Sequence, residues 1–398
     1  MGGHVVTAGG DTAARGKRVL LEHPGLPGLP AAVEANGFVF VSALDGDRNA
    51  DGSIDHASFG NGPAQARNAY AALVRTLEDV GLDGRSLVRV EHATASQDWR
   101  LQRMALWPEM FGTPTQAVSQ GYQGRMVGQN MITVTGVAAR PELERRVVAA
   151  GPDDGRAARI VSVGPFLFVI GVRGEEDLES GERAAEEEEG AFAQQVRIAY
   201  RNIDYWLGRA GAARSDLVRY DAFVRDINRA MEHRALRTDH FGGQMDVAST
   251  LVACPLGGRT DLELSAMALV PGQEKQVSFF GDRGDLARCV KAGGFVFASG
   301  MLGNRGVDSL VRADAISKME PQLELARHRI EASLDSVGSS WSDIVRLDIY
   351  VRDPARQEVA TTWLRQAFAA DSAPAFGVYG VELEPGAEVE LTAIAVAR

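Results

Sequence analysis

Residues 322–353, QLELARHRIEASLDSVGSSWSDIVRLDIYVRD, recur in similar form at two earlier places in the chain. Residues 65–96 read QARNAYAALVRTLEDVGLDGRSLVRVEHATAS, and residues 195–226 read QVRIAYRNIDYWLGRAGAARSDLVRYDAFVRD. The three stretches align without a gap and lie about 130 residues apart. Self-similarity at a fixed period is the signature of a repeated structural unit. The sequence therefore predicts three diverged copies of one small domain.

Each copy predicts a helix followed by a strand. Four apolar residues per copy recur at helical spacing, which buries one face of a helix. They are Ala69, Leu73, Leu77 and Val80, then Ala199, Ile203, Leu207 and Ala210, then Ala326, Ile330, Leu334 and Val337. A glycine follows each stripe, where it relieves left-handed backbone at the end of a helix. The apolar stretches that begin at Leu87, Leu217 and Ile344 then open strands.

Strand patterns flank these helices in every copy. An aromatic-rich strand precedes the helix, at residues 37–41, 165–169 and 294–298. A shorter helical stretch follows the second strand, and an alternating strand closes each copy, at residues 131–135, 262–266 and 389–393. The order β-β-α-β-α-β-β predicts an α/β (α+β) unit, a sheet with both helices on one face.

Polar, turn-rich segments mark the boundaries of the copies, at residues 141–155 and 271–276. They give an N-terminal extension at residues 1–26 and three repeats, at residues 27–142, 156–271 and 276–398. An acidic run at residues 175–189 falls in the second repeat. We expect a solvated loop there, with a docking surface for a basic partner as the alternative.

Composition narrows the functional classes. The net charge of -11 repels nucleic-acid phosphate, so we expect no nucleic-acid partner. No apolar stretch approaches the roughly 20 residues that a membrane span needs, and the first 25 residues hold no apolar signal-peptide run. We therefore expect a cytoplasmic protein. Cys254 and Cys289 are too few for a disulfide framework and are expected in the core.

Motifs for other chemistries are missing from the sequence. The seven histidines show no HExxH pattern or paired ligand spacing, so we expect no metal site. A phosphate-binding P-loop, a GxSxG nucleophile turn and a strand-coupled GxGxxG fingerprint are also absent. We expect no cofactor.

Each copy resembles the Rid family, also called YjgF or RidA, and the third copy resembles it most. Four stretches look like the landmarks of that family: residues 295–300 (FVFASG), 348–353 (DIYVRD), 373–375 (APA) and 390–396 (ELTAIAV). Members are usually homotrimers with a small-molecule pocket between neighbouring subunits. The resemblance implies three tandem Rid/chorismate-mutase-like domains that form an intramolecular pseudo-trimer. It also implies three unequal clefts, a small-molecule substrate, and a self-contained monomer or dimer.

Aligned with the deaminases of that family, the chain lacks four pocket side chains. The family's carboxylate-gripping Arg aligns with Gln116, Ser249 and Phe376, and its last-strand Glu aligns with Thr135, Ser265 and Thr392. Its Tyr aligns with Leu29, Ala157 and Leu286, and its Asn aligns with Met104, Arg234 and Thr361. Standard deamination of 2-iminobutanoate is therefore not expected.

The substituted positions supply the candidate site residues. Thr135, Ser265 and Thr392 are candidate catalytic residues whose hydroxyls would hold water or a carbonyl group. Alternatively, they merely satisfy backbone groups.

Five further residues are candidate substrate-binding residues. Arg234 would anchor an anionic substrate, unless it lies on a solvated helix face near Asp239. The other four are polar side chains near the clefts: Gln116, Ser249, Ser42 and Ser299.

Three functions remain open at this point. The first is a divergent Rid-like enzyme that hydrolyses or rearranges an imine, an enamine or a related reactive intermediate, in specialised biosynthesis. The second is a non-catalytic small-molecule-binding or accessory protein. The third is a chorismatase-like enzyme. Polar clefts that contain Thr135, Ser265, Arg234 or Thr392 favour an enzyme, whereas clefts filled by Phe376 and Met104 favour a binding role.

Overall fold

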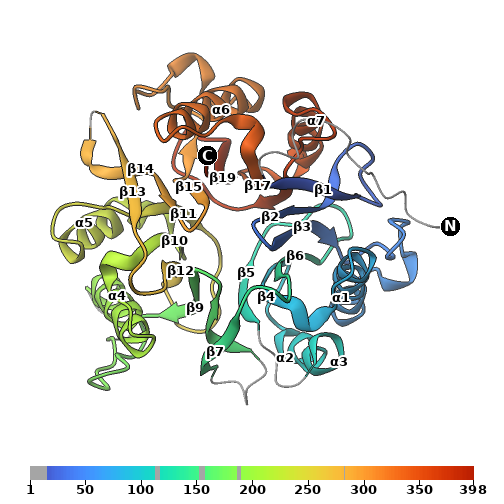
Figure 1. Ribbon diagram of the computed structural model, residues 1–398, viewed down its shortest axis with the longest axis horizontal. Helices are drawn as coiled ribbons and strands as arrows, with labels where there is room; N and C mark the ends of the chain where they lie inside the picture. Colours follow the sequence, from blue (N-terminus) through green and yellow to red (C-terminus); the bar gives the residue numbers. More distant parts are fainter. Residues whose placement is uncertain (1–15, 113–116, 152–156, 186–189, 282) are drawn as a thin grey trace.

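The computed structural model describes residues 16–112, 117–151, 157–185, 190–281 and 283–398. Three similar units form a ring, with strands toward the middle and the long helices at the rim (Figure 1). The α/β fold expected from the sequence is confirmed. No helix in these described ranges is long and apolar enough to cross a membrane.

Corresponding elements follow one another in the three units. Unit 1 contains β1 (Lys17–Glu22), β2 (Pro30–Ala35), β3 (Phe38–Asp45), α1 (Gly62–Asp79), β4 (Leu87–Thr94), α2 (Arg100–Ala105), α3 (Trp107–Phe111), β5 (Val118–Gln123) and β6 (Ile132–Ala139). Unit 2 contains β7 (Arg145–Ala150), β8 (Ala158–Val163), β9 (Phe166–Arg173), α4 (Ala191–Arg209), β10 (Leu217–Val224), α5 (Ala230–His240), β11 (Ala248–Ala253) and β12 (Leu262–Leu269).

Unit 3 contains β13 (Lys275–Phe280), β14 (Arg283–Ala292), β15 (Phe295–Ala298), β16 (Met301–Leu302), α6 (Met319–Asp335), β17 (Ile344–Val351), α7 (Gln357–Ala367), β18 (Ala375–Gly380) and β19 (Val389–Val396). The strand order in this unit is β13-β14-β15-β19-β17-β18. The other two units repeat it, as β1-β2-β3-β6-β4-β5 and as β7-β8-β9-β12-β10-β11. In every unit, the two strands that flank the second helical segment are parallel.

Each unit begins with one strand more than the sequence pattern predicted. The strands β1, β7 and β13 pair antiparallel with β2, β8 and β14. The alternation of apolar and polar residues is weak in these edge strands; in RRVVAA of β7, for example, no side chain is fully buried. The strand β1 lies within residues 1–26, and β7 lies between the first two predicted repeats. We propose that the unit boundaries lie just before β1, β7 and β13.

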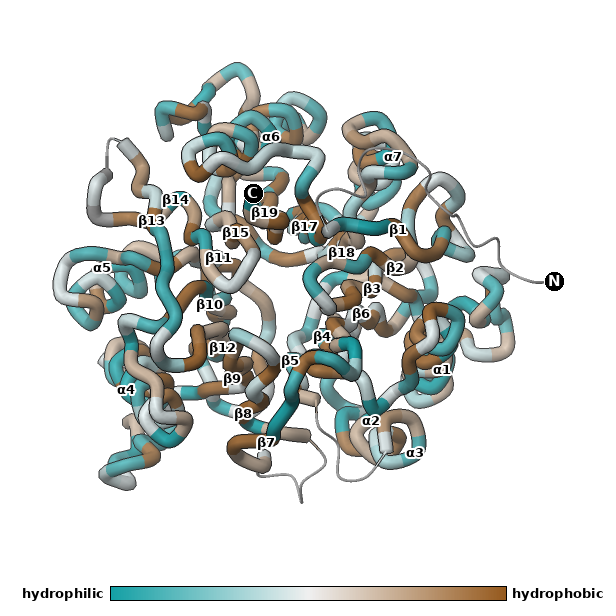
Figure 2. Tube along the Cα trace, viewed as in Figure 1, coloured by the Kyte–Doolittle hydropathy of each residue, from teal (hydrophilic) through white to brown (hydrophobic). Residues whose placement is uncertain are grey.

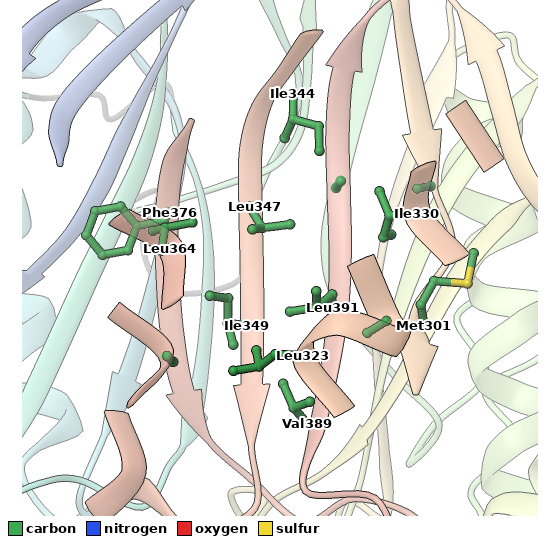
Figure 3. Close-up of a cluster of buried hydrophobic side chains, with 14 of the residues drawn as sticks. Met301, Leu323, Ile330, Ile344, Leu347, Ile349, Leu364, Phe376, Val389 and Leu391 are labelled. Carbon is green, nitrogen blue, oxygen red and sulfur yellow. The ribbon is translucent and has the colours of Figure 1, made fainter. Parts of the chain in front are cut away.

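The packing of helix on sheet follows the predicted stripes. In unit 3, Leu323 and Ile330 of α6 are buried with Leu347 of β17 and Leu391 of β19 (Figure 3). Full burial of one such side chain contributes about 1.5–3 kcal/mol. Hydrophobic residues concentrate on the inner strands, while hydrophilic residues recur along the outer helices (Figure 2).

A buried glutamine at the start of each long helix fixes the loop before the last strand. Gln322 donates from Nε2 to the carbonyl oxygen of Gly386 (2.8 Å) and accepts at Oε1 from the backbone N–H of Glu388 (2.7 Å). Gln65 and Gln195 make the corresponding pairs of bonds in units 1 and 2. This role explains why each of the three matching stretches begins with glutamine.

The three units close the ring through equivalent contacts. The strand β5 contacts β8 and β9, β11 contacts β14 and β15, and β18 contacts β2 and β3. We call these contacts the 1–2, 2–3 and 3–1 seams. At the middle of the ring, the aromatic rings of Phe38, Phe166 and Phe295 lie 5.9–6.0 Å from one another, centroid to centroid.

Buried arginine and acidic side chains also surround the middle of the ring, and their ion pairs join neighbouring units. Arg346 of unit 3 binds Glu91 of unit 1 (3.0 Å), and Arg89 of unit 1 lies 3.4 Å from Asp221 of unit 2. Burial alone would raise the pKa of Glu91, but the surrounding arginines outweigh burial and lower it. These groups line a hollow of about 40 Å³, which has room for a water molecule.

Candidate functional site

The three seams share one layout. A strand of one unit (β5, β11 or β18) packs against the second and third strands of the next unit. Side chains also reach the last strand of that unit: Gln120 of β5 binds Glu263 of β12, and Tyr379 of β18 lies 3.4 Å from Thr135 of β6. In the parallel pairs, Arg89 lies opposite Val118, Arg219 opposite Ala248, and Arg346 opposite Ala375. This register makes Ser119, and not Gln116, the counterpart of Ser249 and Phe376. Gln116 itself lies outside the described residues.

Two glutamates on the last strands were missed by the sequence interpretation. Glu263 and Glu390 precede the candidate residues Ser265 and Thr392 by two positions, and both are buried. Side chains two apart on a strand point to the same face, so each glutamate shares a face with its hydroxyl neighbour. The signal in the sequence was a glutamate inside an otherwise apolar final strand. Unit 1 has Thr133 at this position.

Glu390 lies at the 2–3 seam. Burial, reinforced by nearby Glu384, raises the pKa of Glu390 to about 8, and Arg234 and Arg329 only partly oppose this shift. A Glu390 carboxyl therefore stays largely protonated at neutral pH, which suits a proton donor.

Gly300 and Thr250 form the surroundings of this carboxyl. A Cβ atom on Gly300 would overlap Oε1 of Glu390 and lie 3.2 Å from Oγ1 of Thr250. Both oxygens therefore lie against the bare backbone of Gly300, one from each unit. Oγ1 of Thr250 is buried and has no hydrogen-bond partner among the residues that the structure describes. A buried hydroxyl of this kind has capacity for a water molecule or a ligand.

Arg234, the candidate anchor, crosses the same seam. Its guanidinium forms an ion pair with Glu384 of unit 3, and its side chain is 25% exposed. The neighbouring His233 is buried and lies 3.0 Å from the hydroxyl of Tyr200. Burial, with Arg237 and Arg234 nearby, lowers the pKa of His233 to about 3, so this imidazole is neutral. Arg234 is thus held between the units with its charge already paired.

The 1–2 seam contains the other glutamate, but its polar groups are bonded to one another. Gln120 accepts a hydrogen bond from Ser265 and donates to Oε1 of Glu263 (2.9 Å). Arg173 binds the second carboxylate oxygen of Glu263 at 2.7 Å. In this seam, the side chains of Ser265 and Glu263 therefore join the two units by bonding to other side chains.

The 3–1 seam is closed by aromatic side chains. Phe376 is buried, and a Cβ atom on Gly377 would overlap the hydroxyl of Tyr379. Thr135 accepts a hydrogen bond from Arg346 (3.1 Å) and lies 3.4 Å from the Tyr379 hydroxyl. Thr135 thus belongs to the buried charge network at the middle of the ring.

The remaining candidate hydroxyls serve backbone groups. Ser42 donates to the carbonyl oxygen of Pro30 (2.6 Å) and accepts from the N–H of Phe376 (3.1 Å). Ser299 makes the equivalent two contacts at the 2–3 seam. It donates to a backbone carbonyl of its own unit and accepts from the N–H of Ser249 in unit 2 (3.1 Å). Thr392 donates to a backbone carbonyl of its own unit (3.1 Å). Ser42 and Ser299 therefore join neighbouring units.

Comparisons with known proteins show what this chain is similar to. Residues 282–397 match the family model described as Endoribonuclease L-PSP. The solved structure of a chorismatase is similar over 78% of this chain and 93% of its own, with a TM-score of 0.50 and 14% identity, which concerns the fold alone. Rv2704, from Mycobacterium tuberculosis, is a member of the YjgF/YER057c/UK114 family. It is 30% identical over 32% of this chain and 100% of its own, with a TM-score of 0.26. The search of curated proteins gives no match.

Proposed function

Since this chain belongs to the Rid (YjgF) family, we propose that it is a divergent Rid-like enzyme acting on a small nitrogen-containing reactive intermediate. The reaction we propose is the addition of water to a C=N carbon at the 2–3 seam. The observation that supports it most is the buried carboxyl of Glu390, whose pKa burial raises to about 8.

The proposed steps use one carboxyl group. Protonated Glu390 donates its proton to the imine nitrogen, which makes the C=N carbon electrophilic. The resulting carboxylate takes a proton from a water molecule as the water oxygen bonds to that carbon. Glu390 then donates that proton to the carbinolamine nitrogen and accepts the hydroxyl proton as the C–N bond breaks, so that a carbonyl compound and ammonia leave and Glu390 is protonated again. The hydroxyl of Thr250 would hold the water, and Gly300, which has no Cβ atom, leaves room for the Glu390 carboxyl.

The test compares two equivalent glutamates. Wild type, Glu390→Gln and Glu263→Gln would be assayed for ammonia release from freshly generated imines and enamines, and for turnover of chorismate. We expect Glu390→Gln to lower kcat/KM for the best substrate by about 10²–10⁴-fold. Glu263→Gln, whose native carboxylate is paired with Arg173, is expected to stay within a few-fold of wild type. Equal activity of Glu390→Gln and wild type would refute the proposal.

A second experiment tests Arg234 as the anchor of the substrate, with the variant Arg234→Ala. If the Arg234–Glu384 pair opens to hold an anionic substrate, the variant will raise KM for carboxylate-bearing substrates and leave neutral ones unchanged. Unchanged kinetics and ligand binding would reject Arg234 as the anchor.

A binding or accessory role is the second candidate, and the closed 3–1 seam favours it. Phe376 of unit 3 is buried in one cluster with Leu29 of unit 1, and its ring lies 5.9 Å from the ring of His23, as side chains would pack in a cleft that has lost its ligand. Saturable binding of imine analogues without turnover of any substrate, chorismate included, would support this role over catalysis. Turnover of chorismate that is insensitive to Glu390→Gln would instead point to a chorismatase-like activity.

A further inference from the structure

The strands that pack across the three seams differ at one shared position. The parallel strand pairs place a different residue there in each unit: Gln120 opposite Glu91, Thr250 opposite Asp221, and Gly377 opposite Asp348. Because the three registers match, these positions are equivalent, one for each seam. The side chain changes from an amide to a hydroxyl to none, so this position can make the seams unequal.

At the 1–2 seam, the side chain of Gln120 occupies this position as a ligand would. It is fully buried, its amide nitrogen donates to Oε1 of Glu263 (2.9 Å), and its amide oxygen accepts from the hydroxyl of Ser265. Arg173, which lies opposite Glu263 in the antiparallel pair, binds the second carboxylate oxygen (2.7 Å). Both oxygens of this carboxylate therefore have partners from the chain itself.

The 2–3 seam has an equivalent glutamate without those partners. Thr250 stands in place of Gln120. Leu302, which lies opposite Glu390 in the antiparallel pair, stands in place of Arg173. Neither side chain can offer an N–H group to a carboxyl. Within the part of the chain that the structure describes, Oγ1 of Thr250 is buried without a hydrogen-bond partner, and the buried Glu390 carboxyl makes no hydrogen bond or ion pair.

These unsatisfied groups belong to two units and lie close together. A Cβ atom on Gly300 would overlap Oε1 of Glu390 and lie 3.2 Å from Oγ1 of Thr250. Buried polar groups of native proteins are rarely left unpaired, and those that are often mark the place of a ligand or a water molecule. The 1–2 seam shows which group satisfies the equivalent glutamate, namely a planar amide.

We propose that this position determines which seam admits a ligand: Gln120 fills the 1–2 seam, and Thr250 leaves the 2–3 seam open to a neutral, planar group shaped like a carboxamide. The inference rests on the function proposed for the 2–3 seam and names its substrate class.

The chemistry of the carboxyl group supports this class. A protonated carboxyl has one O–H donor and a carbonyl acceptor, so it pairs with a planar N–C=O or N–C=N group, which presents an acceptor and an N–H donor side by side. A C=N compound whose carbon also bears nitrogen or oxygen has this shape. Its imine nitrogen would then face the proton of Glu390, as the proposed addition of water requires.

The test is an NMR titration of the full chain with propionamide, a neutral carboxamide. The carboxyl carbons of the glutamates would be isotopically labelled, and the Glu390 signal identified by its loss in Glu390→Gln. We expect propionamide to shift this signal saturably in wild type. Thr250→Gln supplies an amide from the chain itself and should raise the Kd of propionamide at least about tenfold. The new amide should also lower the pKa of Glu390, which burial raises to about 8 in wild type.

The reciprocal change should open the other seam. Gln120→Thr removes the amide from Glu263, so a second propionamide site should appear. Gln123→Thr is the matched control, because Gln123 lies on the same strand and its amide donates to the backbone carbonyl of Ala95 in its own unit (3.1 Å). This control should gain no site. Both variants leave the 2–3 seam unchanged, so they decide the proposal even if Thr250→Gln does not fold.

Several outcomes would overturn the proposal. They are an unmoved Glu390 signal in wild type, wild-type affinity in folded Thr250→Gln, no second site in Gln120→Thr, and a site gained equally by Gln123→Thr. Turnover is not measured in this titration, so the two proposals fail separately. Saturable propionamide binding that follows Thr250 and Gln120, without turnover of any C=N compound, would support the ligand position and refute the proposed reaction.

Discussion

The Nζ atom of Lys17 lies 2.5 Å from the backbone carbonyl oxygen of Ile344, at the opposite end of the sequence. The other two units repeat this relationship: Arg145 donates to the carbonyl of Leu87 (3.2 Å), and Lys275 donates to that of Leu217 (2.8 Å). In each case the first residue of a leading strand binds the start of a strand in the preceding unit. Of these three contacts, the one made by Lys17 joins the first unit to the third.

Replacing Lys17 should weaken this closure in a pH-dependent way. Lys17→Met leaves the carbonyl oxygens of Ser342, Ile344 and Ser372 without their donor, at a cost of about 1–3 kcal/mol of unfolding free energy near pH 9. Burial lowers the pKa of Lys17 from 10.5 to about 7, against the opposing effect of Asp343 and Asp371. Between these values the unfolded chain holds the proton more tightly, so the contribution of Lys17 to stability rises with pH.

Urea denaturation at pH 7 and pH 9 would measure this contribution. The deficit of Lys17→Met relative to wild type should be larger at pH 9. Lys318→Met, which removes an exposed lysine, should show no such difference. A deficit that shrinks at higher pH would contradict the prediction.

Removing Arg346 should be the most damaging change at the middle of the ring. Its guanidinium binds Glu91 (3.0 Å), Asp348 (2.8 Å) and Thr135 (3.1 Å), and it is buried. Arg346→Met leaves two buried carboxylates without this partner, so we expect a loss of about 3–5 kcal/mol in chemical denaturation. Arg75→Met should change stability by less than about 1 kcal/mol, because its ion pair is exposed. Equal losses in the two variants would show that the buried network contributes little.

The raised pKa of Glu390 predicts the pH dependence of stability. The folded value of about 8 lies above the ordinary value of 4.5, so the folded state binds the proton more tightly. The contribution of Glu390 is therefore complete below about pH 4.5 and is lost as pH rises through 8. Glu390→Gln, which cannot ionise, should gain stability relative to wild type by about 2–5 kcal/mol from pH 5 to pH 9. Guanidinium denaturation at both pH values checks this; a constant difference would mean an ordinary carboxyl pKa.

Two glycine substitutions should have different effects, one lowering activity and the other raising stability. A Cβ at Gly300 would overlap the Glu390 carboxyl, so Gly300→Ala should displace that group and lower activity. At Gly208, inside α4, a Cβ meets no atom within 4 Å, so Gly208→Ala should stabilise the protein by about 0.5–1 kcal/mol. Thermal denaturation and the substrate assay would measure both. Full activity in Gly300→Ala would remove the argument for room at this seam.

The sequence predicted the helices and inner strands because their patterns are local. The stripe that includes Leu334 and the glycine at position 338 define a helix and its end within a few residues. The edge strands were missed because residues such as Arg145 are half exposed and give no clear alternation. In the sequence alone, Gln116 aligns with the family's Arg, whereas the pairing of Arg89 with Val118 makes Ser119 the counterpart of Ser249 and Phe376.

The candidate site was less predictable, because its chemistry depends on neighbours far away in sequence. The hydroxyls of Ser42 and Ser299 bind backbone groups of another unit, which no local pattern reveals. The sequence shows Glu390 in its strand but not the groups that surround its carboxyl. Its burial and the proximity of Glu384 and Arg234 set its pKa.

By itself, the sequence determined that three copies of one α/β unit follow one another, since apolar periodicity and repeated spacing are properties of the chain alone. Only the tertiary structure decided that the seams differ: one is closed by aromatic rings, one has a paired glutamate, and one has a buried glutamate with a raised pKa beside the bare backbone of a glycine. The reason is physical, because a carboxyl group becomes an acid or a salt-bridge partner according to the water and charges that the other units leave around it.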